Sequence, residues 1–367
     1  MSSAFSVADH AHMARALQLA ERARFTAHPN PVVGCVIAHG DRMVGEGFHL
    51  HAGGPHAEVH ALRMAGEQAR GATAYVTLEP CAHYGRTPPC ALALIQAGVA
   101  RVVCALGDPF DQVAGGGFAL LREAGITVEV GLMAAAAREL NIGFLTRIEQ
   151  GRPFVRIKLA SSLDGRTAMA DGSSQWITGP AARADVQRWR ARAGAVLTGA
   201  GTVLADDPRM DVRLGAEVDV ATGLRVVLDS RLRSLGKGNV RSGDTPTVYL
   251  HAPQVPVPAG DWGQAQFAAV ALAADGRLDL HAVLAELTRR GINEVHVEAG
   301  AQLCGAFVAA GLYDELLLYQ APTLLGDGAR PLLAGLGIQA MTQQRRLQLV
   351  QLQQLGQDLC LRLRPQP

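Results

Sequence analysis

Four residues near the N-terminus have the types and spacing of a catalytic metal site. His56 and Glu58 lie two positions apart in "GPHAEVHAL", and Cys81 and Cys90 follow in "LEPCAHYGRTPPCALAL". A catalytic zinc ion takes three protein ligands and keeps one position open. We therefore predict that His56, Cys81 and Cys90 hold one Zn²⁺ per chain. Glu58 cannot point along the same line as His56, so we expect it to shuttle protons to and from a water at the open position.

The same residues also allow a purely structural interpretation. A histidine that begins a helix is commonly a solvated cap, and a cysteine is commonly a small buried apolar residue. His-x-Glu followed by Pro-Cys is rare by chance and is typical of zinc deaminases, although eight residues separate the cysteines here in place of two. His60 lies one turn after His56, but "HAEVH" is not the His-Glu-x-x-His of metalloproteases. We expect His60 to lie outside the ligand set.

The metal residues can meet only if a sheet and its helices bring them together. The N-terminal sequence predicts helices near 9–24 and 118–124, strands near 32–38, 74–78 and 101–106, and helices that begin at His56 and Cys90. Such alternation is typical of a three-layer α/β domain. We predict a polar joint near 146–153 and, from it, domains at 1–147 and 148–367.

The second domain also has an α/β pattern. Its sequence predicts strands near 154–160 and 225–230, helices near 181–194 and 281–290, and loops near 213–225 and 235–244. The stretches "GAGTVL" and "AGGGFALL" lack the third glycine of a dinucleotide-binding fingerprint, and "GAQLCGAF" lacks the lysine of a P-loop. In "EVHVEAGAQLCGAF", however, Gly300 stands between a strand and a helix. The amides from Ala301 onward can bind a pyrophosphate, or the stretch can be a simple tight connection.

Composition argues against several classes of protein. The chain has 367 residues, a formal net charge of +1 and no basic run, which disfavours binding to nucleic acid. No apolar run approaches the roughly 18–20 residues that span a bilayer, and the N-terminus lacks a secretory pattern. Two of six cysteines are assigned to zinc, and the others stand in apolar segments, as expected of free thiols in a reducing cytoplasm: Cys35, Cys104, Cys304 and Cys360.

Six motifs taken in order resemble the bifunctional riboflavin-biosynthesis deaminase/reductase family over nearly the whole chain. They are "HAE", "PCAHYGRTPPC", "KLASSLDGRTA", "SQWITG", "GTVLADDP" and "VEAG". The resemblance implies an N-terminal cytidine-deaminase-like zinc domain and a C-terminal dihydrofolate-reductase-like α/β domain. The first would deaminate 2,5-diamino-6-(5-phosphoribosylamino)pyrimidin-4(3H)-one, and the second would use NADPH to reduce the ribosyl group, giving 5-amino-6-(5-phosphoribitylamino)uracil. It also implies a cytoplasmic homo-oligomer, a dimer or a tetramer.

The resemblance assigns further roles to matching positions. The substrate contacts that it implies are Asn30, His49 and Arg86 in the first domain, and Ser174, Arg190, Met210, Arg213 and Glu298 in the second. The NADPH contacts that it implies are Ala160, Trp176, Thr202, Asp206, Ser230, Gly300, Ala301, Gln302, Leu303, Cys304, Gly305 and Ala306. Arginines suit a ribose phosphate because they donate in pairs, although Arg190 could instead lie on a solvated helix face.

Lys158 and Asp206 are candidates to position the sugar hydroxyls for reduction. Lys158 could equally be an ordinary solvent-facing residue of an alternating strand. The sequence departs from the family at Ala82, Met210 and Ala299, where serine, leucine and glycine are usual. Two other interpretations stay open at this point: a tRNA or free-nucleobase deaminase with an unrelated C-terminal half, and a non-catalytic zinc-stabilised binding module.

Overall fold

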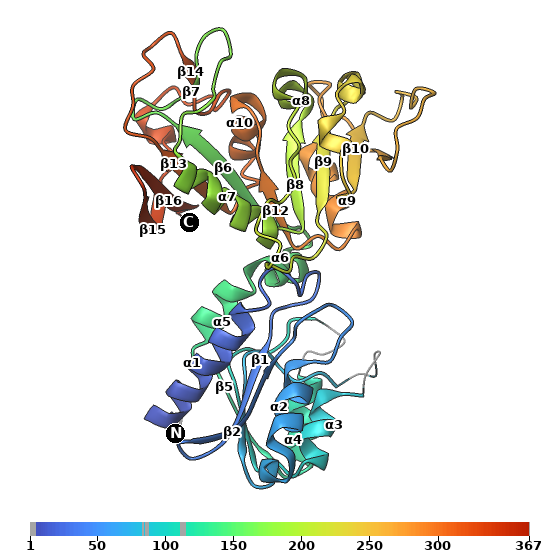
Figure 1. Ribbon diagram of the computed structural model, residues 1–367, viewed down its shortest axis with the longest axis vertical. Helices are drawn as coiled ribbons and strands as arrows, with labels where there is room; N and C mark the ends of the chain where they lie inside the picture. The colour runs from blue at the N-terminus through green and yellow to red at the C-terminus, as the bar shows by residue number, and fades with distance from the viewer. Residues whose placement is uncertain (1–4, 83, 85–87, 111–114, 367) are drawn as a thin grey trace. The chain divides into compact units, whose positions relative to one another are not determined.

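The computed structural model describes residues 5–82, 84, 88–110 and 115–366 (Figure 1). The chain forms two compact units, one of Met1–Gln150 with Asp219–Ala221 and one of Gly151–Val218 with Thr222–Pro367. The predicted polar joint is wrong in its first part, because residues 146–150 belong to a helix that ends at Gln150. That helix carries a buried stripe of Gly143, Leu145 and Thr146, which the charged residues of "TRIEQ" obscure in the sequence.

The first unit is built on a sheet of five strands in the order β2-β1-β3-β4-β5. Strand β1 pairs antiparallel with β2 and β3, and β3, β4 and β5 are parallel. The strands are β1 Gly34–His39, β2 Arg42–Phe48, β3 Thr73–Val76, β4 Arg101–Cys104 and β5 Thr127–Val130. The helices are α1 Val7–Glu21, α2 Ala57–Ala65, α3 Cys90–Gln96, α4 Gly116–Glu123, α5 Ala134–Leu140 and α6 Ile142–Gln150, with the short 3₁₀ turn η1 Gly66–Ala69.

Helices cover both faces of this sheet, as the alternating sequence pattern predicts. Alternate residues of β1 enter two separate cores: Cys35 and Ile37 pack with α2, α3 and α4, whereas Val36 and Ala38 pack with α1 and α5. Gly34 lets α1 lie close to the sheet, because a Cβ there would stand 1.9 Å from the carbonyl oxygen of Ala16. The three-layer prediction is therefore confirmed.

The second unit is built on a sheet of nine strands in the order β11-β10-β9-β8-β12-β6-β13-β16-β15. The strands from β11 to β13 are parallel, and β16 and β15 extend the sheet as an antiparallel hairpin. The strands are β6 Phe154–Ser161, β8 Ala195–Gly199, β9 Leu224–Leu228, β10 Thr247–His251, β11 Gln266–Ala269, β12 Glu294–Val297, β13 Glu315–Gln320, β15 Leu347–Leu355 and β16 Asp358–Pro365. A separate ribbon pairs β7 Arg166–Ala168 with β14 Arg330–Pro331.

The helices of the second unit are α7 Pro180–Arg192, α8 Ala200–Asp206, α9 Leu280–Arg289 and α10 Ala301–Ala309. Three 3₁₀ turns lie at η2 Arg233–Gly236, η3 Asn239–Arg241 and η4 Met341–Gln343. The predicted loop near 235–244 is therefore partly helical. The predicted helices near 181–194 and 281–290 are confirmed with small changes in their bounds.

The two faces of the large sheet differ in chemistry. On the face that packs against α9 and α10, β6 and β12 contribute apolar core residues such as Ile157 and Val297. On the other face, Arg156 is fully buried and donates to Glu294 and Glu315 at 2.7 Å each. Helix α7 covers this charged layer and lays Trp189 over the Arg156 guanidinium at 4.3 Å.

Candidate functional site

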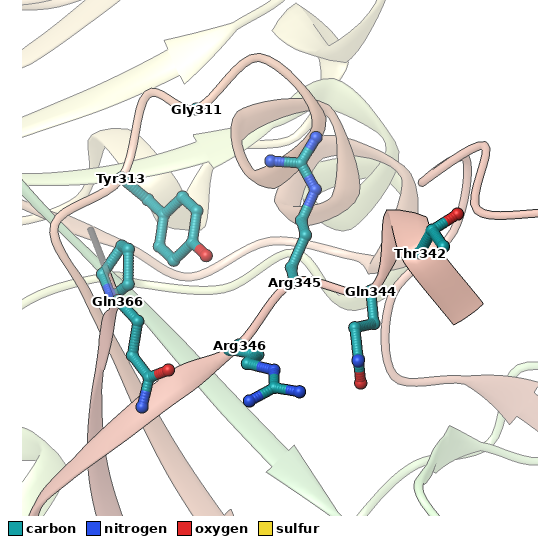
Figure 2. Close-up of a pocket in the computed structure, with 8 residues that line it drawn as sticks. Gly311, Tyr313, Thr342, Gln344, Arg345, Arg346 and Gln366 are labelled. Carbon is teal, nitrogen blue, oxygen red and sulfur yellow. The ribbon is translucent and has the colours of Figure 1, made fainter. Parts of the chain in front are cut away.

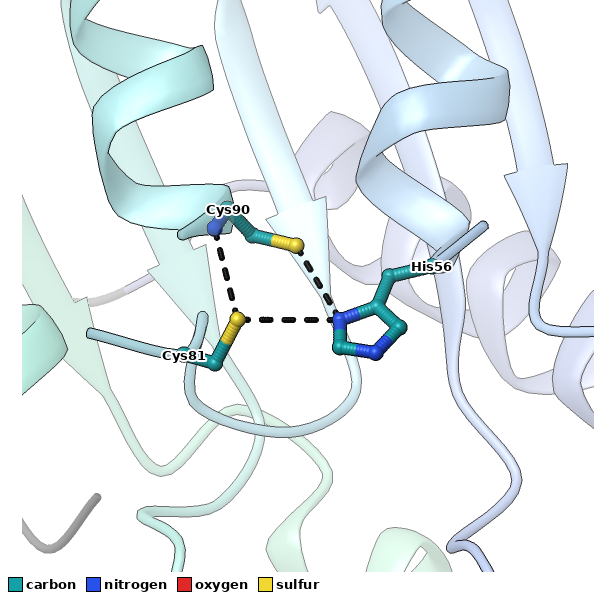
Figure 3. A group of neighbouring side chains, drawn as sticks. All are labelled: His56, Cys81 and Cys90. Atoms are coloured by element: carbon teal, nitrogen blue, oxygen red, sulfur yellow. Dashed lines mark hydrogen bonds between the residues drawn. The ribbon is translucent and has the colours of Figure 1, made fainter. Parts of the chain in front are cut away.

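The three predicted metal ligands come together in the first unit (Figure 3). His56 is the N-cap of α2, Cys81 lies in the loop after β3, and Cys90 is the first residue of α3. Nδ1 of His56 lies 3.2 Å from Sγ of Cys90 and 3.6 Å from Sγ of Cys81. Although His56 occupies the N-cap position, its ring makes no capping hydrogen bond and instead lies against the two cysteines, so the interpretation as a solvated cap is wrong.

The spacing of these atoms fits zinc. Bonds of about 2.3 Å to sulfur and about 2.0–2.1 Å to nitrogen, at a tetrahedral angle, place the nitrogen and each sulfur about 3.6 Å apart. The three ligand atoms lie within 4.8 Å of one another, and His60 is not among the residues that converge on this point. One imidazole and two sulfurs leave a fourth position for a reactant.

The surroundings of Cys81 favour the thiolate form, which is the form that binds a metal. Hydrogen bonds from Cys90 and His56 lower the pKa of Cys81 to about 4 against the effect of burial, so this group is a thiolate at neutral pH. The backbone N–H of Cys90 also donates to Cys81 Sγ at 3.3 Å. The start of α3 thus contributes both a ligand and a donor that stabilises the other ligand.

Glu58 stands in the first turn of α2 with 3% of its surface exposed. Burial raises the pKa of its carboxyl group, and the neighbouring His56 opposes this shift. A carboxyl group with a raised pKa exchanges protons readily near neutral pH. Its burial beside the ligand cluster suits the predicted proton shuttle.

Two predicted substrate contacts of the first unit also meet. Nδ2 of Asn30 lies 3.0 Å from Nε2 of His49, and Nδ1 of His49 lies 3.1 Å from the carbonyl oxygen of Pro55. The His49 ring packs edge-on against His56 at 5.4 Å between ring centres. Burial lowers the pKa of His49, which keeps its ring neutral. Arg86 lies outside the described residues.

Glu79 is a residue of this site to which the sequence analysis assigns no role. Its Oε1 accepts the backbone N–H groups of Gly117 and Phe118 at 3.0 and 3.2 Å, and its Oε2 accepts those of Asp108 and Gly115 at 3.2 and 3.1 Å. Glu79 therefore ties the chain just before Cys81 to the start of α4. An acidic residue beside Pro-Cys was the available signal.

In the second unit the predicted cofactor residues gather at the carboxyl ends of neighbouring strands. Ala160 is the penultimate residue of β6, Thr202 follows β8, Ser230 follows β9 and Gly300 follows β12. These four strands are consecutive in the sheet. Ligands of open α/β sheets bind outside this edge. Trp176 lies on a loop after β7, is 70% exposed and is stacked by the Arg183 guanidinium at 4.5 Å.

Helix α10 begins as a strand–glycine–helix connection. Gly300 is its N-cap with φ −71°, so the turn does not need a residue in the left-handed region. Ala301, Leu303 and Ala306 are half-buried and Gln302 is exposed. Cys304 and Gly305 are buried, and a Cβ on Gly305 would stand 1.8 Å from the carbonyl oxygen of Ala334. The glycine at 305 thus serves packing.

The predicted substrate residues Arg190 and Glu298 form a buried ion pair. Nε and Nη2 of Arg190 donate to the two Glu298 oxygens at 2.5 and 2.8 Å, and Nη1 donates to the Asp211 carbonyl oxygen at 2.8 Å. The Arg190 side chain is only 9% exposed, so the interpretation as a solvated helix face is wrong. The Arg213 side chain is 58% exposed and accessible to a phosphate.

Three further predicted site residues of the second unit differ in how buried they are: Met210, Ser174 and Asp206. Met210 packs in the core beside Val203 with 4% exposure, and its φ of 55° is unusual for a non-glycine residue. Its side chain packs against neighbouring protein atoms, and its predicted contact with the substrate stays a prediction. Ser174 is half-buried in the loop before α7. Asp206 is the exposed last residue of α8, where partial burial of the carboxyl group raises its pKa.

Lys158 lies on the charged face of β6, which its alternation with Ile157 predicts. The interpretation as a solvent-facing residue is wrong, because the side chain is half-buried. Burial lowers the pKa of its ammonium group, although the charge of Glu298 opposes the shift. Its Nζ lies 6.0 Å from the centre of the Tyr319 ring.

Comparison with known proteins identifies the family of each unit. Residues 6–106 match the cytidine and deoxycytidylate deaminase zinc-binding region, and residues 153–361 match the RibD C-terminal domain. The riboflavin biosynthesis protein RibD of Escherichia coli (strain K12) is 48% identical over 366 residues, which cover 97% of this chain and 99% of the relative. That of Haemophilus influenzae is 47% identical over 371 residues, which cover 98% of each chain.

Two solved structures share the fold of this chain over nearly its whole length. Acinetobacter baumannii RibD superposes with a TM-score of 0.88 at 46% identity, covering 98% of this chain and 99% of that one. A diaminohydroxyphosphoribosylaminopyrimidine deaminase/5-amino-6-(5-phosphoribosylamino)uracil reductase from Thermotoga maritima superposes with a TM-score of 0.87 at 31% identity and the same coverage.

A zinc-binding deaminase unit followed by a reductase unit defines a bifunctional deaminase and reductase. The matches extend over nearly the whole chain, which belongs to the RibD family of riboflavin biosynthesis proteins. The fold class and the two cofactors implied by the motifs, zinc and NADPH, are thereby confirmed. The alternatives of an unrelated C-terminal half and of a non-catalytic zinc module are wrong.

Proposed function

We propose that residues 1–147 deaminate 2,5-diamino-6-(5-phosphoribosylamino)pyrimidin-4(3H)-one and that residues 148–367 reduce the ribosyl group of the product to ribityl. The convergence of His56, Cys81 and Cys90 beside the buried Glu58 is the observation that carries the first step. The Thermotoga maritima relative, whose description names this pair of activities, supports the order of the reactions.

In the first step, water adds to the ring carbon that bears the amino group, and ammonia leaves. Zinc, when bound, supplies a Lewis acid that makes water a better nucleophile. Glu58 accepts a proton from the attacking water and delivers it to the departing amino group. We propose that Asn30 and His49 hold the pyrimidine and its ribose beside Glu58, and that Arg86 meets the 5′-phosphate.

In the second step, the sugar must be aligned with the nicotinamide. NADPH, when bound, supplies the hydride. We propose that Lys158 and Asp206 position the sugar hydroxyls, and that Arg213 binds the phosphate with its exposed guanidinium. Ser174, Arg190 and Glu298 complete the substrate pocket in this proposal.

We propose that the carboxyl edge of the sheet holds NADPH. The proposed contacts are Ala160, Trp176, Thr202, Asp206, Ser230, Gly300, Ala301, Gln302, Leu303 and Ala306. Cys304 and Gly305 are buried and can contribute only through the backbone of α10. The start of α10 offers unpaired N–H groups to a phosphate.

A coupled assay tests the two activities and their order. Purified, zinc-quantified protein is given the diaminopyrimidine ribosyl phosphate, and ammonia release is followed with and without NADPH. We expect ammonia without NADPH, and NADPH oxidation only after deaminated product has formed. Neither signal from a fully zinc-loaded protein would overturn the proposed substrate.

We propose that the protein is cytoplasmic and forms homo-oligomers. All six cysteines are unpaired thiols, which fits a reducing compartment. No helix in the described parts of the chain is long and apolar enough to cross a membrane.

The edge strand β15 supports the proposed oligomer. It is exposed along most of its length, and its sequence "LQLVQLQQL" has no charge or proline to block pairing with another strand. Light scattering should therefore give a mass above one chain, and Leu352→Lys should lower it. A monomeric wild-type protein at micromolar concentration would contradict this proposal.

A further inference from the structure

The middle of β12 carries a histidine for which the proposed reaction has no role. Glu294, His296 and Glu298 alternate along the strand and its end, so their side chains share the charged face beneath α7. The His296 side chain has no exposed surface, and β12 is paired on both sides, with β6 and β8. A central parallel strand is ordinarily apolar on both faces. The imidazole therefore needs an explanation other than hydrophobic packing.

His296 lies between two groups of ion pairs. Its Nε2 is 3.4 Å from Oε1 of Glu298, the same oxygen that accepts Nε of Arg190 at 2.5 Å. Its partner in the β12–β6 register is Arg156, which Glu294 holds. The imidazole thus stands beside the Glu298–Arg190 pair on one side and the Arg156–Glu294 pair on the other.

Within the described residues, neither ring nitrogen of His296 has an aligned hydrogen-bond partner, and Nη2 of Arg156 also has none. A buried polar group without a partner is destabilising, and such groups in native proteins call for a specific explanation. Hydrogen bonds of catalytic sites are often long before substrate binds and shorten in the complex. The 3.4 Å separation is one that a small movement of the Glu298 carboxylate would close.

The charge state of the ring suits this contact. Burial lowers the pKa of His296, although the nearby Glu298 carboxylate opposes the shift. A neutral imidazole has one N–H donor and one acceptor. A donor at Nε2 suits the Glu298 carboxylate, whose Oε1 lies 3.4 Å away.

We propose that His296 is a positioning residue of the reductase site, which donates from Nε2 to Glu298 and fixes the carboxylate that Arg190 also holds. Glu298 then meets the substrate in a single orientation. This inference rests on the proposed contact between Glu298 and the substrate. His296 itself touches neither substrate nor cofactor in this scheme.

Steady-state kinetics of His296→Leu and His296→Gln test the proposal. Leucine keeps much of the volume and removes the donor, whereas the glutamine amide can place an N–H near the position of Nε2. We expect His296→Leu to lower kcat/KM for the deaminated substrate about tenfold, the size expected for a hydrogen bond to a charged group. His296→Gln should recover most of this loss. The KM for NADPH and the deaminase activity of the first unit should stay at wild-type values in both variants.

Glu298→Gln and the double variant His296→Leu/Glu298→Gln separate this inference from the proposed function. If His296 acts through Glu298, the leucine change should have little further effect once Glu298 is replaced. Unchanged reductase kinetics in Glu298→Gln would overturn the substrate contact of Glu298. A strong loss in Glu298→Gln with wild-type kinetics in His296→Leu would overturn the role of His296 alone.

A general packing defect would give a different result. Equal losses in His296→Leu and His296→Gln, together with a raised KM for NADPH, would mean that the ring only fills space and would also overturn the proposal. If His296→Leu does not fold, His296→Asn provides the comparison, because its shorter amide does not reach the Glu298 carboxylate.

Discussion

Replacing Glu79 by glutamine should disable the deaminase through a residue that holds no metal. The Glu79 carboxylate accepts four backbone N–H groups, two on each oxygen. Glutamine keeps one acceptor oxygen and turns an NH₂ group toward the other two donors. Whichever way the amide is oriented, two buried hydrogen bonds to a charged acceptor are lost.

The magnitude follows from these contacts. Hydrogen bonds to charged groups contribute about 1.5–3 kcal/mol each, so the change should destabilise the first unit by roughly 3–6 kcal/mol. For a unit of this size the melting temperature should fall by roughly 10 °C or more. Because Cys81 follows Glu79 by two residues, zinc affinity should fall about 10–100-fold, as for other residues that orient metal ligands.

Zinc affinity, measured by chelator competition, and the two activities, measured separately, check this prediction. Reductase turnover on deaminated substrate should be unchanged, which makes the second unit an internal control. Leu120→Ala, a partly buried change on the neighbouring α4, is a matched control that should lower stability without a comparable loss of zinc affinity. Wild-type zinc affinity and deaminase activity in Glu79→Gln would refute the reasoning.

Three further predictions concern other parts of the chain. Cys90→Ala should abolish zinc retention and ammonia release while leaving reductase turnover intact, as measured by metal analysis and the separate assays; retained zinc would contradict the ligand assignment. Arg213→Gln should raise the KM for the phosphorylated substrate at least tenfold, because an exposed guanidinium is lost from the phosphate, and should leave the KM for NADPH unchanged; an unaltered substrate KM would remove Arg213 from the site. Burial opposes ionisation of Asp9, but hydrogen bonds from Arg101 and other groups outweigh it and hold the Asp9 pKa well below its usual range. This stabilisation is present above the ordinary aspartate pKa of about 4 and is lost as the pH falls below it. The free energies of unfolding of the wild type and of Asp9→Asn should therefore differ most at neutral pH and become equal in acid. A difference that does not change with pH would contradict the assignment.

The metal site was predictable because its ligands lie close in sequence to the starts and ends of elements. A histidine before a helix, a cysteine after a buried strand and a cysteine after two prolines each have a position that local chemistry determines. The central strands β1, β3 and β4 of the first sheet were predictable for a similar reason, since buried strands and amphipathic helices alternate along the chain. The edge strands β2 and β5 were not predicted, because they are less buried.

Other features depend on partners far away in the sequence. Arg190 was expected on a solvated face or against a phosphate, but Glu298, more than a hundred positions later, holds it in a buried pair. Met210 is enclosed by a core that no local pattern reveals. The C-terminal hairpin of β15 and β16 was not predicted either, although the alternation of glutamine and leucine in β15 is a strand pattern. The exposed β15 depends on its pairing with β16 and not on a buried face.

The two-faced sheet of the second unit constrains how the sequence can change over time. Removing one member of the layer formed by Arg156, Glu294 and Glu315 would break buried ion pairs and leave the remaining buried charges with fewer partners, which is destabilising. Replacing the whole layer with apolar residues of similar volume is often neutral or stabilising. The apolar alternative is thus separated from the present sequence by destabilised intermediates. Single substitutions pass through these destabilised intermediates, so selection can retain the charged layer even where an apolar layer would be more stable.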